Sequence, residues 1–199
     1  MRTLAIRYLA ILFSMPAGVY AQKDEILFKV IFKGNDIGTL VAFEERSGER
    51  RTRDLRSITD AKVMVIAIHV ESEISSTHEN GTFIKSTAYR HSNRGSQDVH
   101  SQVTRMESSK YKCERNGTTH IESREITFSI VDLYFKEPSG LTEIFSTMYA
   151  DFLPIQSRTP GEYLVTTPDN MKAWYSYKDG KLVKIESETP LGTVVSTRE

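Results

Sequence analysis

The stretch Thr77-His-Glu-Asn80-Gly81-Thr-Phe83-Ile84 decides the fold class, because it places an Asn-Gly dipeptide between two segments that can pair as strands. Both central residues of a type I′ turn need positive φ, which asparagine, aspartate and glycine tolerate, and this turn matches the twist of paired strands. The same signal returns at Asn116-Gly117 and Asp179-Gly180. The sequence therefore predicts three β-hairpins in a mainly β protein whose sheet is mostly antiparallel.

A fourth hairpin is predicted around residues 34–38, which read Gly-Asn-Asp-Ile-Gly. If Asn35-Asp36 forms a two-residue loop, apolar residues meet across the strands as sheet stabilisation requires: Phe28 faces Phe43, and Val30 faces Val41. This register is self-consistent.

The most β-like run of the chain spans residues 62–77. Alternation with a period of two puts five apolar side chains on one face: Met64, Ile66, Ile68, Val70 and Ile74. The other face begins apolar and ends polar. We expect one central strand that is covered on both sides at one end.

Residues 129–149 break the β pattern. Their apolar residues recur at helical spacing, at Ile130, Leu133, Tyr134, Leu141, Ile144, Phe145 and Met148. Ser129 and Thr142 can serve as N-caps, and Pro138-Ser-Gly140 separates the two pieces. This pattern predicts two short helices packed against the sheet, after which the chain returns to strands up to about residue 189.

The first 21 residues have the three parts of a secretory signal peptide. Arg2 and Arg7 precede a short apolar run at residues 8–13, and Pro16 precedes the small residues expected before a cleavage site after Ala21. A retained anchor would need roughly 20 consecutive apolar residues, about twice this run. We therefore expect residues 1–21 to be a signal peptide and residues 22–199 to be a single β-rich domain. We expect no stable membrane span after removal of the signal peptide, and a periplasmic or secreted location.

Composition excludes several classes of function. The chain has 26 basic and 26 acidic side chains, so it has no electrostatic footprint for nucleic acid. Cys113 is the only cysteine, which excludes an intramolecular disulfide. A basic cluster over residues 49–56 includes Arg53 and is offset by neighbouring acids such as Glu44, which favours a solvated edge strand.

Several blocks of the C-terminal half resemble a family of uncharacterised secreted bacterial domains. The matching blocks are residues 132–138 (Asp-Leu-Tyr-Phe-Lys-Glu-Pro), 144–146 with Tyr149, 163–165, 168–170, 175–177 and 179–182, and residues 34–38 resemble the family's opening turn. The resemblance implies a strongly curved antiparallel sheet, similar in type to the half-barrels of periplasmic lipoprotein carriers. It implies no catalytic residue.

Two groups of residues could carry out chemistry. In a two-residue Asn116-Gly117 hairpin, Cys113 lies opposite His120 and Tyr111 lies opposite Glu122, which would let a histidine activate a thiol. A buried, inert cysteine is the alternative, and the burial tendency of cysteine favours it.

The second group is His69, Glu71 and Glu73, which share one face of a strand and could contribute ligands to a divalent cation. In the expected Asn80-Gly81 hairpin, Glu71 instead faces Arg90, and an exposed ion pair is the plainer reading. The sequence therefore predicts no metal, no cofactor and no catalytic residue.

Seven aromatic residues remain as candidate ligand-binding residues: Tyr134, Phe135, Phe145, Tyr149, Trp174, Tyr175 and Tyr177. They could line a cavity for an apolar or amphipathic ligand, or they could simply form the core. Our leading hypothesis is a non-enzymatic binding or carrier protein of the cell envelope. A structural or protein-interaction module of the envelope is the alternative, and an enzyme using Cys113 and His120 is a weaker one.

Overall fold

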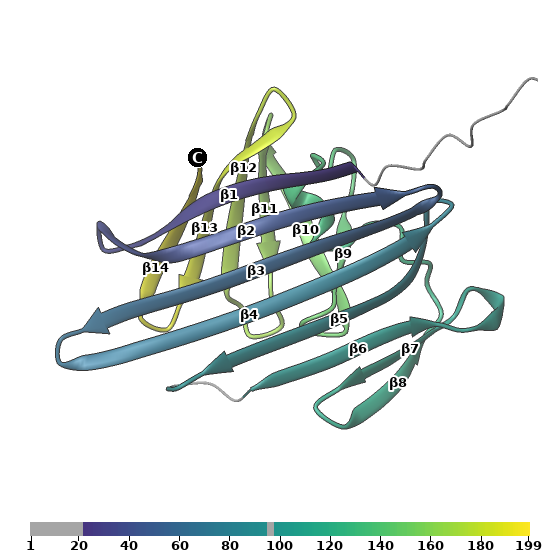
Figure 1. Cartoon of the computed structure of the whole chain (residues 1–199), viewed down its shortest axis with the longest axis horizontal. Coiled ribbons are helices and arrows are strands. Elements are labelled where there is room, and N and C mark those ends of the chain that lie inside the picture. Colours follow the sequence, from purple (N-terminus) through teal and green to yellow (C-terminus); the bar gives the residue numbers. More distant parts are fainter. Residues whose placement is uncertain (1–21, 95–97) are drawn as a thin grey trace, which may run out of the picture.

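One antiparallel sheet organises the whole of the computed structural model, which describes residues 22–94 and 98–199 (Figure 1). The predicted signal peptide lies outside the described residues, and β1 begins at Gln22. In chain order the strands are β1 (Gln22–Phe32), β2 (Asn35–Ser47), β3 (Arg50–Val63), β4 (Ile66–Glu79), β5 (Thr82–Ser92), β6 (Val99–Arg105), β7 (Tyr111–Arg115), β8 (Thr118–Glu122), β9 (Glu143–Ser146), β10 (Asp151–Thr159), β11 (Glu162–Thr166), β12 (Lys172–Lys178), β13 (Lys181–Thr189) and β14 (Gly192–Arg198).

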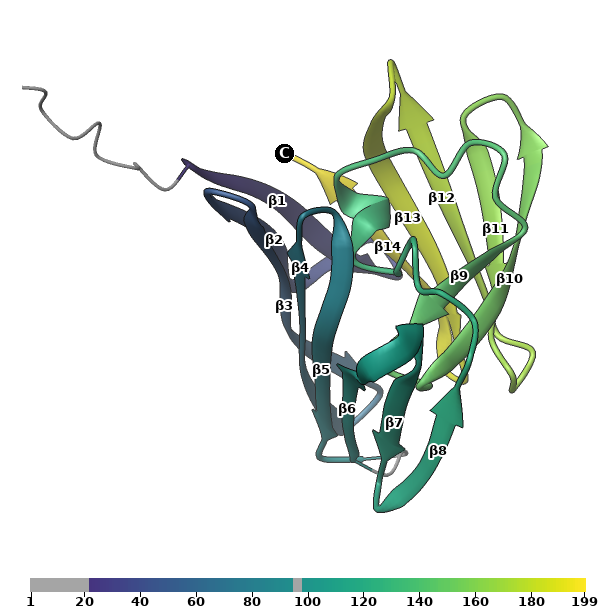
Figure 2. The same cartoon turned by 90° about the vertical axis from the view of Figure 1, so that its right-hand side faces the viewer.

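The sheet is a meander whose two ends are β8 and β9. Its spatial order is β8-β7-β6-β5-β4-β3-β2-β1-β14-β13-β12-β11-β10-β9, so the first and last strands of the chain pair in the middle. The sheet curls until the arm formed by β2–β8 faces the arm formed by β9–β13 (Figure 2). The prediction of a mainly β, curved antiparallel sheet is confirmed, and the sheet is open because β8 and β9 do not pair.

The three turn dipeptides form the predicted hairpins. Asn80, Asn116 and Asp179 have φ of 50°, 47° and 52°, and the glycine after each also has positive φ. These turns connect β4 to β5, β7 to β8, and β12 to β13.

The fourth hairpin exists, but its predicted loop is wrong. The turn falls on Lys33 and Gly34, and a β-bulge after Val30 shifts the pairing so that Phe28 lies opposite Leu40. Gly38 serves a different purpose, because a Cβ there would lie 2.1 Å from the carbonyl oxygen of Ile58 on β3. The second glycine of the motif thus permits close approach of two strands.

The single strand expected over residues 62–77 is also wrong, because the chain reverses at Met64 and Val65. Ile66, Ile68, Val70 and Ile74 do share a face, and Val63 pairs with Ile66. The two-residue turn shifts the alternation by one residue, since the odd-numbered Val63 shares a face with the even-numbered Ile66. The unbroken apolar run of residues 63–66 hides this shift in the sequence. No glycine, proline or asparagine marks the reversal, and the fourteen residue pairs of β3 with β4 hold the turn in place.

The two predicted helices are wrong. Between residues 129 and 149 the structure has only a 3₁₀ turn, η2 (Asp132–Tyr134), and the short strand β9; a second 3₁₀ turn, η1 (Glu107–Ser109), lies elsewhere, and the described residues contain no α-helix. Residues 128–130 pair with β9 instead: the Ile130 amide donates to the Phe145 carbonyl at 2.8 Å, and the Phe145 amide donates to the Phe128 carbonyl at 2.9 Å.

Residues 123–142, which we name the crossover segment, connect β8 to β9 and run between the two arms (Figure 2). The main core is formed where this segment packs against both arms, with Phe28, Leu133, Ile144 and Leu182 buried. The helical spacing of its apolar residues arose because the segment is enclosed from several sides. None of the described residues belongs to a helix that is long and apolar enough to cross a membrane.

Candidate functional site

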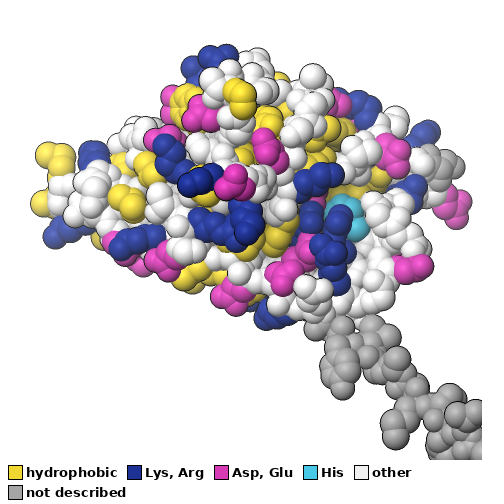
Figure 3. Space-filling model, turned by 90° about the horizontal axis from the view of Figure 1, so that it is seen from above, with side chains coloured by type: hydrophobic (Ala, Val, Ile, Leu, Met, Phe, Trp, Pro, Cys, Tyr) yellow, Lys and Arg dark blue, Asp and Glu magenta, His cyan; other side chains and the backbone are white. Residues whose placement is uncertain are grey.

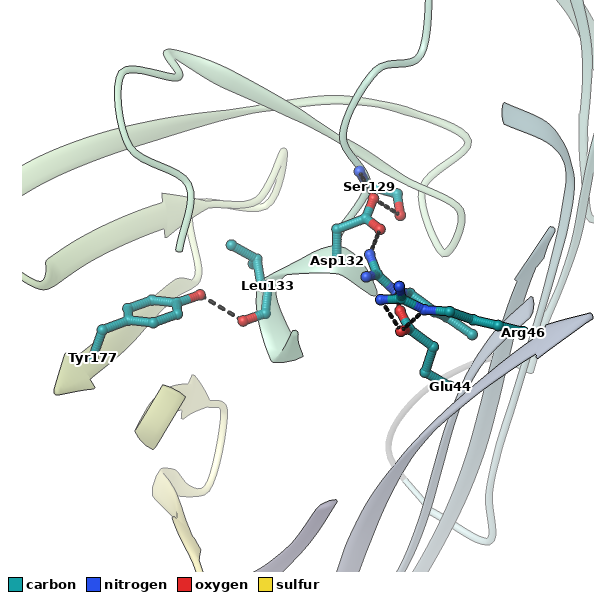
Figure 4. Close-up of polar contacts among 7 residues, drawn as sticks. Glu44, Arg46, Ser129, Asp132, Leu133 and Tyr177 are labelled. Carbon is teal, nitrogen blue, oxygen red and sulfur yellow. Dashed lines mark hydrogen bonds and ion pairs between the residues drawn. The ribbon is translucent and has the colours of Figure 1, made fainter. Parts of the chain in front are cut away.

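A buried ion network fixes the crossover segment to the concave face of the sheet. Glu44 on β2 and Arg53 on β3 are paired residues, and the Arg53 Nε donates to Glu44 at 2.5 Å (Figure 4). The Arg53 guanidinium also donates to Asp132 of η2, whose other oxygen accepts from the Ser129 amide at 2.6 Å and the Ser129 hydroxyl at 2.8 Å. Glu44, Arg53 and Asp132 are all buried.

This network corrects the expectation of a solvated basic edge strand. β3 lies inside the sheet between β2 and β4, and Arg53 is covered by Phe135, whose ring centroid is 4.7 Å from the guanidinium carbon. Burial alone would raise the pKa of Glu44, but Arg53 and Arg46 outweigh it and hold that pKa below its ordinary value. Glu44 is therefore ionised, and its two arginine partners compensate for the cost of burying its charge.

Two more arginines join the arms where β8 and β9 leave the sheet open. Arg124 donates to Glu122 on β8 at 2.8 Å and to Glu143 on β9 at 3.0 Å. Arg115 on β7 donates to the Met148 carbonyl at 2.9 Å. Arg115 and Arg124 thus connect the two arms through side chains where backbone pairing stops.

Unpartnered buried polar atoms lie on one region of the concave face. They belong to residues of the adjacent strands β3–β6: Arg51, Ser76, His78, Arg90, Ser101 and Arg105. Burial is the main reason why the pKa of His78 is lowered, so this imidazole is neutral near pH 7. The concave face of this arm therefore carries buried polar side chains beside the apolar cluster that contains Phe83 and Val103.

The predicted opposition of Cys113 and His120 is confirmed, as is that of Tyr111 and Glu122. Cys113 is fully buried, however, whereas His120 is exposed. Burial, assisted by Glu122 and Asp151, raises the pKa of the Cys113 thiol to about 11. A protonated, buried thiol is a poor nucleophile, so the geometry favours packing for Cys113.

His69, Glu71 and Glu73 lie on the outer face of β4, but the predicted pairing of Glu71 with Arg90 is wrong. A bulge after Thr77 shifts the register by one, and Glu71 lies opposite His91. Each of the three side chains already has a partner: Asp60 for His69, Tyr89 for Glu71 and Arg56 for Glu73. Within the described residues no three His, Cys, Asp or Glu side chains are grouped to hold a metal ion.

The seven aromatic candidates are divided among several environments. Tyr134, Phe145 and Tyr175 are buried in the two hydrophobic clusters, and Phe135, Tyr149 and Tyr177 are half-buried beside the main cluster. The Tyr177 hydroxyl donates to the Leu133 carbonyl at 2.6 Å (Figure 4), and the half-buried Trp174 occupies the strand position next to the buried Tyr175. None of the seven lines either of two hollows that lie on the surface of the described structure.

These hollows lie on the outer face of the sheet. The larger, of about 360 Å³, is lined by residues of β4–β7 such as Glu73, Tyr89, His100 and Gln102. Sequence reasoning missed it, because its residues come from four strands and only their cross-strand pairing brings them together.

A second missed feature is the end of the β3–β4 hairpin. Residues 61–68, which we name the distal hairpin, include the turn residues Met64 and Val65, each 89% exposed. Figure 3 shows hydrophobic side chains at the end of the molecule where this hairpin projects. The sequence shows no sign of this turn, because Met64 and Val65 are not residues that typically form turns.

The fold and these sites define a mainly β protein of one open, curved antiparallel sheet. It has a buried ion network inside, and the outer-face hollows and the distal hairpin are its two candidate binding surfaces. Residues 28–199 match the family model described as a domain of unknown function, DUF6134, and the chain belongs to that family. No curated protein and no solved structure matches the chain.

Proposed function

We propose that this chain is an exported, non-enzymatic binding protein of the cell envelope that contacts a lipid surface through the distal hairpin. The observation that carries the proposal is the exposure of Met64 and Val65 at the tip of a projecting hairpin. Hairpin turns are ordinarily polar, since loops run through water.

Backbone strain supports a functional role for the tip. Met64 has φ of 58°, in the left-handed region that costs a non-glycine residue about 1–2 kcal/mol. Glycine at this position would relieve the strain and remove the exposed side chain. A residue that is unfavourable both in conformation and in exposure points to selection for binding.

The apolar character continues along the hairpin. On the concave side Val63 pairs with Ile66, and Ala61 pairs with Ile68, and Ile66 is itself exposed. Lys62, which is also exposed, flanks this surface on the other side of β3. An aliphatic tip beside a lysine suits the boundary between lipid chains and headgroups.

The size of the tip favours lipid over a protein partner. A stable protein interface buries about 800 Å² per partner, far more than three side chains provide. Insertion of Met64 and Val65 into lipid would contribute about 3–6 kcal/mol in total, because burial of one such side chain contributes about 1.5–3 kcal/mol. Such a contact is weak and reversible, as a carrier or peripheral protein requires.

Export is supported by the signal-peptide pattern of residues 1–21. A non-enzymatic role is supported by the buried, protonated state of Cys113 and by the ion partners of His69, Glu71 and Glu73.

Vesicle co-sedimentation of the chain lacking residues 1–21 tests the proposal. The probe is phosphatidylcholine vesicles, and the test variant is Met64→Gly with Val65→Ser, because glycine suits a hairpin turn with positive φ at its first position. The control is Met106→Ser, which removes an exposed methionine that directly follows β6. The C-terminal end of β6 lies at the opposite end of the molecule from the distal hairpin (Figure 1).

We expect the wild type and the control to sediment with vesicles, and the turn variant to stay in solution with its thermal stability kept or raised. Equal sedimentation of all three proteins would overturn the proposal, as would failure of the wild type to bind. Loss of self-association in the turn variant, without any vesicle binding by the wild type, would assign the tip to protein contact instead.

A second candidate function is strand addition at β8. This five-residue strand pairs only with β7 among the described residues, and its residues Thr118–Ile121 are exposed. An extended peptide could pair with its free backbone groups. Hydrogen exchange would show protection of residues 118–122 on addition of such a partner.

A further inference from the structure

The outer face of β4–β7, which is turned toward the viewer in Figure 1, carries a hollow of about 360 Å³. Its lining follows from cross-strand register. Glu73, Tyr89 and His100 form one row across β4, β5 and β6, and Thr87, Gln102 and Glu114 form the next row across β5, β6 and β7. The hollow falls within the size range of small-molecule sites, about 300–1,000 Å³.

An aromatic pair forms the floor of the first row. The rings of Tyr89 and His100 lie 5.2 Å apart between centroids, and the Tyr89 hydroxyl donates to Glu71 at 3.3 Å. This bond holds the tyrosine ring in place while His100 is exposed. The half-buried Tyr89 ring and the exposed His100 ring can pack against the C–H groups of a flat, partly apolar ligand.

Polar groups surround the floor, and their charges are balanced. Glu73 is bonded to Arg56 at 3.0 Å, and Glu114 is bonded to Lys112 at 3.3 Å. Gln102 and Thr87 add uncharged donors and acceptors between these pairs. The hollow therefore offers many hydrogen bonds without a net charge that would select an ion.

The β7–β8 turn, which forms a rim of the hollow, is held by three hydrogen bonds. Asn116 of the β7–β8 turn accepts a hydrogen bond from the His100 amide at 2.8 Å and donates to the Asp98 carbonyl at 2.9 Å. The Asn116 amide also donates to the His100 carbonyl at 2.8 Å. A rim held by three hydrogen bonds loses little conformational entropy on binding.

A second hollow of about 240 Å³ adjoins the first at Thr87, which lines both. Its lining is rich in hydroxyl groups, with Thr52, Ser75 and Thr77, and it carries Arg50 and Lys85. Together the two hollows form a trough along β4 and β5. A trough of this kind suits an extended ligand better than a compact one.

We propose that this trough binds a linear oligosaccharide. Hydroxyl groups of a sugar chain can bond to Glu73, Gln102 and Glu114, while the C–H face of one sugar ring packs against Tyr89 and His100. An apolar ligand would displace water from Glu73, Gln102 and Glu114 without replacing its hydrogen bonds. A small anion would meet a carboxylate on each side of the larger hollow, because Glu73 lies on β4 and Glu114 on β7. The proposal does not depend on the lipid contact of the distal hairpin.

Nuclear magnetic resonance titration of the folded chain tests the site. The probes are cellotriose and chitotriose. Glucose serves as a monosaccharide for comparison, and sodium sulfate tests whether the site binds an anion instead. The variants are His100→Ala and Gln102→Ala, and Gln156→Ala is the matched control, since Gln156 is an exposed strand residue on β10.

We expect a trisaccharide to shift the amide signals of residues 73–75, 87–89 and 100–102, and to bind more tightly than glucose. His100→Ala and Gln102→Ala should each weaken binding about fivefold, as loss of one hydrogen bond or ring contact does. Gln156→Ala should bind as the wild type does.

The absence of any shift with either trisaccharide would overturn the proposal. It would also be overturned by binding that His100→Ala and Gln102→Ala leave unchanged, or by tighter binding of sulfate than of the trisaccharides. Co-sedimentation with insoluble cellulose and chitin then distinguishes two sources of the sugar chain. If the protein pellets with the polysaccharide, the ligand is a polysaccharide surface. If the protein stays in the supernatant but binds a trisaccharide, the ligand is a free oligosaccharide.

Discussion

The guanidinium of Arg53 on β3 bonds the carboxylate of Asp132 in the crossover segment, 79 residues later in the chain. Both side chains are buried, and each has one further partner, Glu44 for Arg53 and Ser129 for Asp132. This contact attaches the crossover segment to one arm of an open sheet.

We predict that Asp132→Ala strongly destabilises the fold, because it leaves Arg53 buried with one of its two carboxylates missing. Breaking a buried pair by removing one partner costs about 3–5 kcal/mol. Urea unfolding followed by circular dichroism measures the change. Glu186→Ala, which removes an exposed partner of Lys184 at 2.9 Å, should cost at most about 1 kcal/mol. Equal effects of the two substitutions would contradict the role of Asp132.

His78 should make stability depend on pH. Burial chiefly lowers its pKa below the ordinary 6.5, with Arg51 and Arg53 lowering it further, and the nearby carboxylates of Asp132 and Glu44 acting in the opposite direction. The unfolded chain therefore binds a proton at higher pH than the folded chain does. The stabilising contribution is fully present above pH 6.5 and is lost as the pH falls toward the folded pKa.

Urea midpoints measured through this range check the prediction. The wild type should lose stability as the pH falls below 6.5, whereas His78→Gln should show a flatter dependence in the same window. The lowered pKa of Glu44 adds a second loss at lower pH, below its ordinary value of 4.5. A His78→Gln profile parallel to that of the wild type would count against the assignment.

Cys113 should be unreactive in the folded protein. Its thiol is fully buried and its pKa is raised to about 11, so little thiolate exists at neutral pH. Labelling by iodoacetamide followed by mass spectrometry should proceed only in denaturant. Rapid labelling of the native protein at neutral pH would revive the enzyme hypothesis, and His120→Ala would then show whether the histidine is responsible.

Gly38 should tolerate no side chain. Its φ is 147°, and an added Cβ would lie 2.1 Å from the Ile58 carbonyl oxygen, so Gly38→Ala must displace β2 from β3. We expect a loss of about 1–3 kcal/mol, the usual range for forced backbone shifts. Gly48→Asn is the comparison, because Gly48 has φ of 59° and nothing within 4 Å of an added Cβ. Thermal unfolding of both variants should separate the two glycines clearly.

Local signals in the sequence are enough to predict the class of fold and part of its register. Turn dipeptides and period-two alternation are local signals, so three hairpins and the opposition of Cys113 to His120 followed from residues close together in the chain. The reversal at Met64 and Val65 escaped prediction, because the unbroken apolar run of residues 63–66 hides the change of phase in the alternation.

The remaining features depend on contacts between segments that lie far apart in the chain. Residues 129–149 show helical spacing, yet they form η2 and β9 because the two arms enclose them and the sheet edge supplies their hydrogen bonds. The Arg53–Asp132 contact and the trough on β4–β7 join residues from separate strands. Long-range pairing and the bulges that shift it depend on the free energy of the whole sheet, and no local segment of sequence carries that information.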